Sequence, residues 1–150
     1  MLNISSICFI LFPVSGTIAY KVIEKKDLPQ IEQNLLDFYD RYFLNKSNQI
    51  IIKNCSVFFV AIKNNEVIGV CRMLTDFSRY AVLLDLIVRK LERKKGIGSQ
   101  ITRMATSYCK NKNIKHLILT TDPRDSSLTS FYQKLGFKIV TNQFLMEFSV

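Results

Sequence analysis

The sequence predicts a single domain of the α/β class, in the α+β arrangement, with a mixed and mostly antiparallel central sheet flanked by helices. Its 150 residues, 48% of them hydrophobic, are enough to bury one substantial core. Segments with helical spacing of apolar residues alternate with short β-branched and aromatic segments, in the order β-α-β-β-β-α-β-α-β. No repeat, low-complexity tract or linker interrupts this order, so we expect one domain over residues 17–150.

The first elements are a strand and a helical region. Residues 17–24 (TIAYKVIE) are rich in β-branched and aromatic side chains, which is typical of a strand. Asp27 as N-cap and Pro29 in the first turn then indicate the start of a helix. Apolar residues at spacings of three and four extend that helix to about Phe43, and a shorter helix is expected after it.

Three strands follow. Residues 55–63 (CSVFFVAIK) and 66–75 (EVIGVCRMLT) are separated by Asn64 and Asn65. Asparagine tolerates positive φ, so these two strands are expected to form a hairpin with a tight turn. Residues 80–88 (YAVLLDLIV) are the third strand.

The last third of the chain predicts two more helices, each followed by strand. Residues 98–111 have apolar side chains at helical spacing, and residues 115–121 (KHLILTT) form a strand. Residues 126–135 form a helix that ends at Gly136, the residue type most common just past a helix end. Residues 137–150 are expected to supply one or two closing strands.

The N-terminal residues 1–16 contain a short apolar run, ICFILF. No Lys or Arg precedes it and Pro13 interrupts it, so we interpret the segment as an extra edge segment or a poorly ordered leader rather than a signal peptide. No window approaches the ~18 apolar residues that a membrane span requires, and no membrane association is expected.

The cysteines indicate a reducing compartment. Cys8, Cys55, Cys71 and Cys109 are widely spaced and form no C-x-x-C pair, and His116 is the single histidine. No metal site of zinc type follows from these spacings. We therefore expect four reduced thiols in a cytoplasmic protein.

The chain is strongly basic, with 21 Lys and Arg against 12 Asp and Glu and a net charge of +9. This charge suits an anionic partner, such as nucleic acid, a lipid surface or a phosphorylated small molecule, and does not choose among them.

A glycine-containing loop lies between the third of these strands and the next helix. In LIVRKLERKKGIGSQI (residues 86–101), Gly96 and Gly98 permit a tight turn and close approach of a ligand to the backbone. The helix start offers unpaired N–H groups and the positive end of its dipole, beside the cations Arg93, Lys94 and Lys95. The loop matches neither G-x-G-x-x-G nor a P-loop, and it predicts a site for a phosphate or pyrophosphate.

Two motifs resemble the GNAT N-acetyltransferase superfamily. VRKLERKKGIGS resembles its [RQ]-x-x-G-x-[GA] signature through Arg93, Gly96 and Gly98. Downstream, SFYQKLGFKI (residues 130–139) resembles a second family segment with Tyr132 at its centre. The resemblance covers roughly residues 57–139 and implies the GNAT fold, with the acetyl group of acetyl-CoA transferred to an amine.

The resemblance also implies where acetyl-CoA binds. The backbone of one strand would hold the pantetheine arm, and the following loop would hold the pyrophosphate. The corresponding residues here are Leu86, Ile87 and Val88 for the strand, and Arg93, Lys94, Lys95, Gly96, Ile97, Gly98 and Ser99 for the loop. The N–H near Val88 would stabilise the oxyanion.

Two residues are candidates for proton transfer. Tyr132 matches the family's general acid, and a phenol (pKa ~10) can donate to a departing thiolate (~8.5). Asp85 is a lone carboxylate inside an apolar strand, where burial would favour a base. An ion pair of Asp85 with Arg72 or Lys115 is an equal alternative at this point.

The chain departs from the family pattern at two positions. Asp125 stands where many members have an Asn that contacts the pantetheine arm, and Leu128 stands where they have Ala. An aspartate accepts hydrogen bonds but does not donate them as asparagine does. The expected cofactor contact of Asp125 therefore depends on its accepting role.

The expected acceptor is a primary amine of a small molecule or a peptide, and nothing in the sequence names it. The aromatic residues Phe38, Tyr39, Tyr42 and Phe43 have a spacing that favours core packing over a pocket. A homodimer is compatible with exposed closing strands.

Two alternative functions remain. One is a basic nucleic-acid-binding domain, although the sequence lacks any recognised RNA- or DNA-binding motif. The other is a GNAT fold that binds CoA without efficient catalysis.

Overall fold

The protein is described by a computed structural model over residues 16–43 and 47–140. Its five-stranded sheet has the order β1-β2-β3-β4-β5. β1 to β4 pair antiparallel in succession, and β5 joins β4 in parallel. The mixed, mostly antiparallel sheet expected from the sequence is therefore confirmed. The strands are β1 (Ala19–Glu24), β2 (Val57–Lys63), β3 (Glu66–Thr75), β4 (Tyr80–Val88) and β5 (His116–Ile118).

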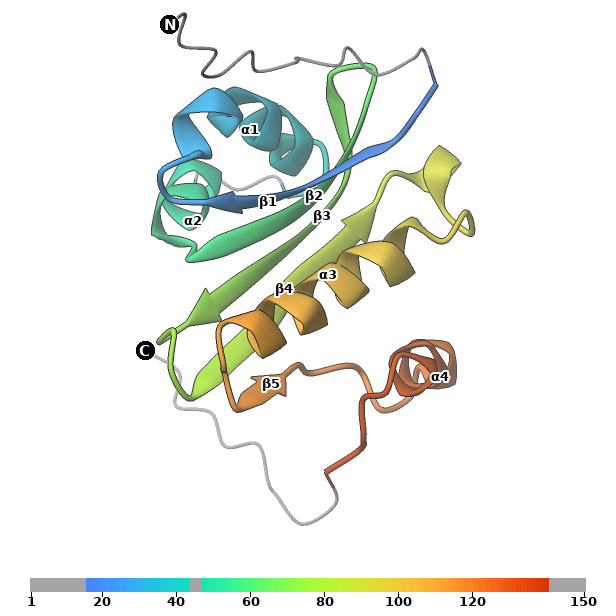
Figure 1. Cartoon of the computed structure of the whole chain (residues 1–150). Coiled ribbons are helices and arrows are strands. Elements are labelled where there is room, and N and C mark those ends of the chain that lie inside the picture. Colours follow the sequence, from blue (N-terminus) through green and yellow to red (C-terminus); the bar gives the residue numbers. More distant parts are fainter. Residues whose placement is uncertain (1–15, 44–46, 141–150) are drawn as a thin grey trace, which may run out of the picture.

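Helices cover both faces of this sheet (Figure 1). The short helix η1 (Leu28–Gln30), α1 (Glu32–Asp40) and α2 (Asn48–Asn54) precede β2, while η2 (Lys90–Glu92) and α3 (Ile97–Asn111) follow β4. α4 (Ser126–Lys134) comes after β5 and ends before Gly136, at φ 91°. The β2–β3 turn is the expected hairpin, with Asn64 and Asn65 both at positive φ.

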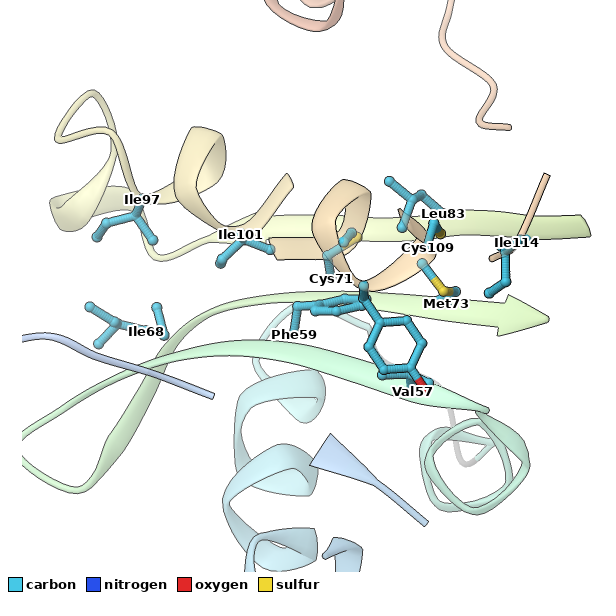
Figure 2. Close-up of a cluster of buried hydrophobic side chains, with 14 residues drawn as sticks. Val57, Phe59, Ile68, Cys71, Met73, Leu83, Ile97, Ile101, Cys109 and Ile114 are labelled. Carbon is cyan, nitrogen blue, oxygen red and sulfur yellow. The ribbon is translucent and has the colours of Figure 1, made fainter. Parts of the chain in front are cut away.

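Two apolar cores lie on opposite faces of the sheet. On one face, Ile97, Ile101 and Ala105 of α3 pack against Phe59, Cys71, Met73 and other sheet residues (Figure 2). On the other face, Leu35, Phe38 and Tyr39 of α1 and Ile52 of α2 pack against Phe58, Val60 and Val70. Because successive strand residues point to opposite faces, both helical layers are held by the same strands.

β5 is shorter than the sequence predicts and leaves part of β4 without a neighbour. It pairs only with Tyr80, Ala81 and Val82, although residues 115–121 were expected to be strand. Beyond Val82, β4 continues to Val88 with β3 on one side and, among the described residues, no strand on the other. In Figure 1, β5 and α4 diverge from the end of β4.

β4 also contains a β-bulge. Arg72 pairs with Leu84 and Val70 with Ile87, so three steps along β4 match two steps along β3. Asp85 lies in this interval with φ 52°, in the left-handed region. The sequence contains no signal of this irregularity, because almost every side chain of β4 is apolar.

Other expectations fall partly outside the description. Residues 137–140 are described and form no strand, and the rest of the expected closing strands, residues 141–150, lies outside the described residues, as do residues 1–15 with Cys8. Cys55, Cys71 and Cys109 are buried free thiols. Within the described ranges, no helix is long and apolar enough to cross a membrane, and no group of side chains suits a metal ion.

Candidate functional site

A cleft of about 890 Å³ lies where β4 ends and α3 begins. Its walls come from the end of β4, the η2–α3 loop with the start of α3, α4, and the residues just after α1. Nine residues expected from the sequence line it: Leu86, Ile87, Val88, Arg93, Lys94, Gly96, Ile97, Gly98 and Ser99. Lys95, Asp125, Tyr132 and Asp85 are not among its lining residues.

The two glycines have different structural roles. Gly96 is the N-cap of α3 with φ 80°, a backbone conformation that a residue with a Cβ adopts at a cost. Gly98 lies inside α3, and a Cβ there would contact Phe131 at 3.7 Å and Val88 at 3.8 Å. A side chain at Gly98 would therefore occupy the space between the β4 wall and the α4 wall of the cleft.

The first turn of α3 directs unpaired amides toward this space. The Gln100 N–H donates to the Gly96 carbonyl at 3.0 Å and begins the helical ladder. The N–H groups of Ile97, Gly98 and Ser99 precede it and have no partner within the helix. With the helix dipole they form an anion-binding end.

Charged side chains around the loop are organised by Glu92. Its carboxylate binds Lys63 at 2.9 Å and Lys95 at 3.0 Å, and these hydrogen bonds lower its pKa. Arg93 turns back, and its Nε donates to the Val88 carbonyl at 3.0 Å. Neither Arg93 nor Lys94 is in an ion pair among the described residues. Lys94 lines the cleft and makes no side-chain hydrogen bond to the described residues either, so it is available to an anion in the cleft.

The backbone N–H of Val88, the last residue of β4, points toward the cleft rather than toward β3. The Arg89 N–H donates to the Ile68 carbonyl of β3 at 2.8 Å. Since N–H directions alternate along a strand, the Val88 N–H points away from β3. The bond from Arg93 to the Val88 carbonyl supports the same orientation. Val88 thus offers an N–H at the unpaired edge of β4, as an oxyanion donor requires.

Tyr132 lies on α4, half-buried in an aromatic cluster. Its ring makes edge contacts with Phe131 and Phe137, with centroids 4.9 and 5.6 Å apart. Burial, followed by the nearby Cys71, raises the pKa of Tyr132 to about 12. Its hydroxyl makes no hydrogen bond to the described part of the chain and stays protonated at neutral pH. It is therefore a free donor beside the cleft wall formed by Phe131.

Asp125 is the N-cap of α4. Its Oδ1 accepts from the N–H groups of Ser127 at 3.0 Å and Leu128 at 3.1 Å, and from Ser127 Oγ at 2.6 Å. The Ser127 hydroxyl and then the Leu128 amide lower the Asp125 pKa. Capping places Ser127 and Leu128 in the cleft wall. The cofactor contact expected for Asp125 stays a prediction.

Asp85 is ion-paired with Arg72, the first of the two partners considered from sequence. The two side chains are 23% and 17% exposed, respectively. The expected base role of Asp85 is not tested by this contact and stays a prediction.

Several lining residues were not expected. Phe38 and Tyr39 are buried core residues as predicted, while Tyr42 and Phe43 line the cleft. Phe131 and Ser127 of α4 also line it. Ser127 and Phe131 are four residues apart and therefore lie on one face of α4. Phe131 also directly precedes Tyr132, and this adjacency to a predicted site residue could have identified that face from the sequence.

Comparison with known proteins agrees with this geometry. The model of the Acetyltransferase (GNAT) family matches residues 20–137. N-alpha-acetyltransferase 30 of Schizosaccharomyces pombe is 28% identical over 121 residues, which is 75% of this chain and 76% of the relative. Streptothricin acetyltransferase A of Bacillus subtilis is 31% identical over 81 residues, 54% of this chain and 47% of the relative.

Solved structures show the same fold. A GNAT family protein of Streptococcus pneumoniae has a TM-score of 0.69 at 21% identity, covering 89% of this chain and 98% of its own. An aminoglycoside acetyltransferase from an uncultured soil sample, in complex with sisomicin, has a TM-score of 0.67 at 18% identity, covering 89% and 96%. A predicted acetyltransferase of Clostridium acetobutylicum with acetyl-CoA has a TM-score of 0.63 at 14% identity, covering 87% and 96%. At these identities the likeness concerns the fold, whereas the family match spans most of the chain, and the protein therefore belongs to the GNAT family of acetyltransferases.

Proposed function

We propose that this protein transfers the acetyl group of acetyl-CoA to a primary amine of a small molecule or a peptide, by direct attack of the amine on the thioester. The observation that carries the proposal is one cleft that joins the unpaired edge of β4 to the open amides of α3. A strand edge suits the amides of a pantetheine arm, and a helix start suits a diphosphate.

The residues of the cleft fit acetyl-CoA. The N–H groups of Gly98 and Ser99 would hold the pyrophosphate, and Lys94 would add charge from the loop. The absence of a Cβ at Gly98 keeps open the space that the diphosphate would need between Val88 and Phe131. Leu86, Ile87 and Val88 would bind the pantetheine arm. Acetyl-CoA supplies the activated acetyl thioester.

Two groups of the chain would act on the developing charges. The Val88 N–H points to the unpaired edge and would stabilise the oxyanion with a fixed dipole. Tyr132, with a pKa of about 12, stays protonated and would donate to the departing sulfur. Because complete transfer to a thiolate of pKa ~8.5 is uphill from such a phenol, the hydrogen bond itself supplies most of the stabilisation.

The acceptor must lose a proton before or during the attack. A peptide α-amine has a pKa of ~8 and is partly neutral near that pH without a strong base. Asp85 was expected as the base, but its carboxylate is bound by Arg72.

A test of the proposal measures binding and turnover separately. Thermal unfolding with and without CoA tests the cleft, and we expect CoA to raise Tm. A panel of amines and peptide N-termini with acetyl-CoA, followed by release of free thiol, tests transfer. Absence of a CoA shift would overturn the cofactor assignment. A CoA shift without turnover on any amine would support a GNAT fold that binds CoA without efficient catalysis.

Tyr132→Phe tests the second catalytic group. The replacement keeps the ring contacts with Phe131 and Phe137 and removes only the hydroxyl. Loss of a positioned acid lowers kcat by about 10²-fold or more, with CoA affinity nearly unchanged. Gln133→Ala, an exposed neighbour on the same helix, is the matched control. An unchanged kcat in Tyr132→Phe would show that the hydroxyl has no part in the reaction.

A further inference from the structure

We propose that Arg72 is a positioning residue: its guanidinium holds Asp85 in the left-handed backbone conformation and thereby fixes the bulge that orients the end of β4 toward the cleft. The inference rests on the proposed acetyl transfer, because the oriented groups are those expected to bind the pantetheine arm and the oxyanion. It assigns Asp85 to the positioning pair rather than to proton abstraction.

The bulge changes which side chains of β4 point to each face of the sheet. Before it, Ala81 and Leu83 face the α3 core. After it, Leu86 and Val88 face that core, while Ile87 packs on the α1 side. Strict alternation from Leu83 would have placed Ile87 on the α3 face and Val88 on the α1 face. One extra residue therefore decides which side chains and which N–H groups the end of β4 presents to the cleft.

Asp85 is the residue that carries this irregularity. Its φ of 52° is uncommon for a residue with a Cβ, although aspartate tolerates it better than most. Arg72 lies on β3 at the position paired with Leu84, directly before the bulge, and its Nε donates to Asp85 Oδ2. A charge-assisted bond between the two sides of the bulge resists a return to the regular register.

The ion-pair partner of the Asp85 carboxylate argues against the base role. Arg72 belongs to β3, which lies on the side of β4 opposite its unpaired edge. The carboxylate is thus bound by the guanidinium of the neighbouring strand rather than left free to accept a proton from an amine at the unpaired edge. The hydroxyl of Tyr39 is buried and makes no hydrogen bond to Asp85 or to any other described residue.

The decisive experiment compares Asp85→Gly with Asp85→Ala. Both remove the carboxylate, but glycine adopts positive φ freely whereas alanine does not. If the pair serves conformation, kcat of Asp85→Gly exceeds that of Asp85→Ala by about tenfold, the factor that corresponds to the left-handed penalty of a Cβ. Equal losses in both variants, with the acidic limb of the pH–kcat profile gone, would identify Asp85 as the base and overturn the proposal.

Arg72→Met provides the independent arm. It retains much of the aliphatic length and leaves the Asp85 carboxylate unpaired, so kcat and CoA affinity should both fall. Adding Asp85→Gly to Arg72→Met should recover activity relative to Arg72→Met alone, since the bulge then no longer needs a charge partner. A double variant no better than Arg72→Met would contradict the proposal. Glu66→Ala, which removes the exposed partner of Arg89, is the control for losing an Arg–carboxylate pair in this sheet.

Measuring CoA affinity tests the role of the Arg72–Asp85 pair even if the proposed acetyl transfer is wrong. If the wild type binds CoA but acetylates no amine tested, the dissociation constant replaces kcat as the readout of β4 orientation. Weaker CoA binding in Asp85→Ala than in Asp85→Gly supports the positioning pair even then. Equal CoA affinity in all variants, each folded by circular dichroism, would overturn it.

Discussion

The two halves of β4 are both mostly apolar, yet they have different roles. Ala81 and Val82 pair with strands on both sides and Tyr80 pairs with β5, whereas the paired residues within 83–88 pair only with β3 in the described structure. The first half is part of a continuous sheet, and the second half presents one edge of its backbone to a cleft. The difference shows that a strand becomes a binding element when its neighbour ends early.

The largest effect on kcat should come from removing a single backbone N–H from the second half of β4. Val88→Pro removes the N–H that faces away from β3, so the sheet should persist, because proline is tolerated at an open edge. Loss of an oxyanion donor lowers kcat by about 10²–10³-fold. Steady-state kinetics measures this, with urea unfolding as the check on stability.

Ile87→Pro is the matched variant for the other edge. Ile87 pairs with Val70, and alternation from Arg89 directs its N–H into the β3 ladder. We expect this variant to unfold at much lower urea concentration than Val88→Pro. Equal stability of the two would contradict the assigned N–H directions.

Leu83→Ala tests the buried side of the same strand. Leu83 is 6% exposed and belongs to the α3 core, so truncation should cost about 2–5 kcal/mol of unfolding free energy. Because its side chain does not line the cleft, CoA affinity of the folded variant should stay close to that of the wild type. Chemical denaturation and calorimetric titration with CoA measure the two quantities. A large loss of CoA affinity in a stable variant would show that the two halves of β4 are not separable.

Gly98→Ala should lower CoA affinity and leave stability intact, which is the reverse of the result expected for Leu83→Ala. The added methyl would meet only ordinary contacts of 3.7 Å or more, and alanine in a helix is favoured over glycine by about 1 kcal/mol. Stability should therefore be kept or slightly raised. CoA affinity should fall by about tenfold or more, since 1.4 kcal/mol of steric cost already has that effect. Ser107→Ala, on an exposed face of α3, is the control. Unchanged CoA affinity would remove Gly98 from the binding site.

The smallest effect is expected on stability, from the turn at Asp76 that leads into the first half of β4. Asp76 Oδ1 accepts from the N–H groups of Ser78, Arg79 and Tyr80 at 2.8 to 3.0 Å. These bonds, that of Ser78 first, lower the pKa of Asp76 to about 2. A depressed folded pKa means that the contribution is present above the unfolded value of ~3.8 and is lost as pH falls toward 2.

Asp76→Ala should therefore lower Tm at pH 6 and have a shrinking effect between pH 4 and about 2. CoA binding should be unaffected, since the turn lies at the opposite end of β4 from the cleft. A destabilisation that stays constant with pH would show that the carboxylate charge is not what holds the turn.

The sequence predicted those features that depend on local signals. The bounds of β4 agree with residues 80–88, and the turn at Asn64 and Asn65 has the expected positive φ values. The glycine loop led to the cleft because Gly96 adopts a positive φ at the start of α3, and because Gly98 leaves open the space between Val88 and Phe131.

Features that depend on pairing between distant segments were not predictable. Residues 119–121 have strand-forming side chains, yet β5 ends at Ile118, because pairing requires a neighbour that runs alongside. The bulge at Asp85 was not predictable because the residues before and after Asp85 are apolar, so a change in the sheet face that they occupy does not alter the sequence pattern. The Arg72 partner of Asp85 could be named only as one of two possibilities.

The early end of β5 has a consequence for behaviour in solution. An open strand edge is a template on which another chain can add a strand, and proteins usually cover or charge such edges. Here the edge of residues 83–88, which has no strand neighbour among the described residues, is the same one that a bound ligand would cover. Self-association on concentration should therefore decrease when CoA is present, and light scattering at matched protein concentrations would record the difference.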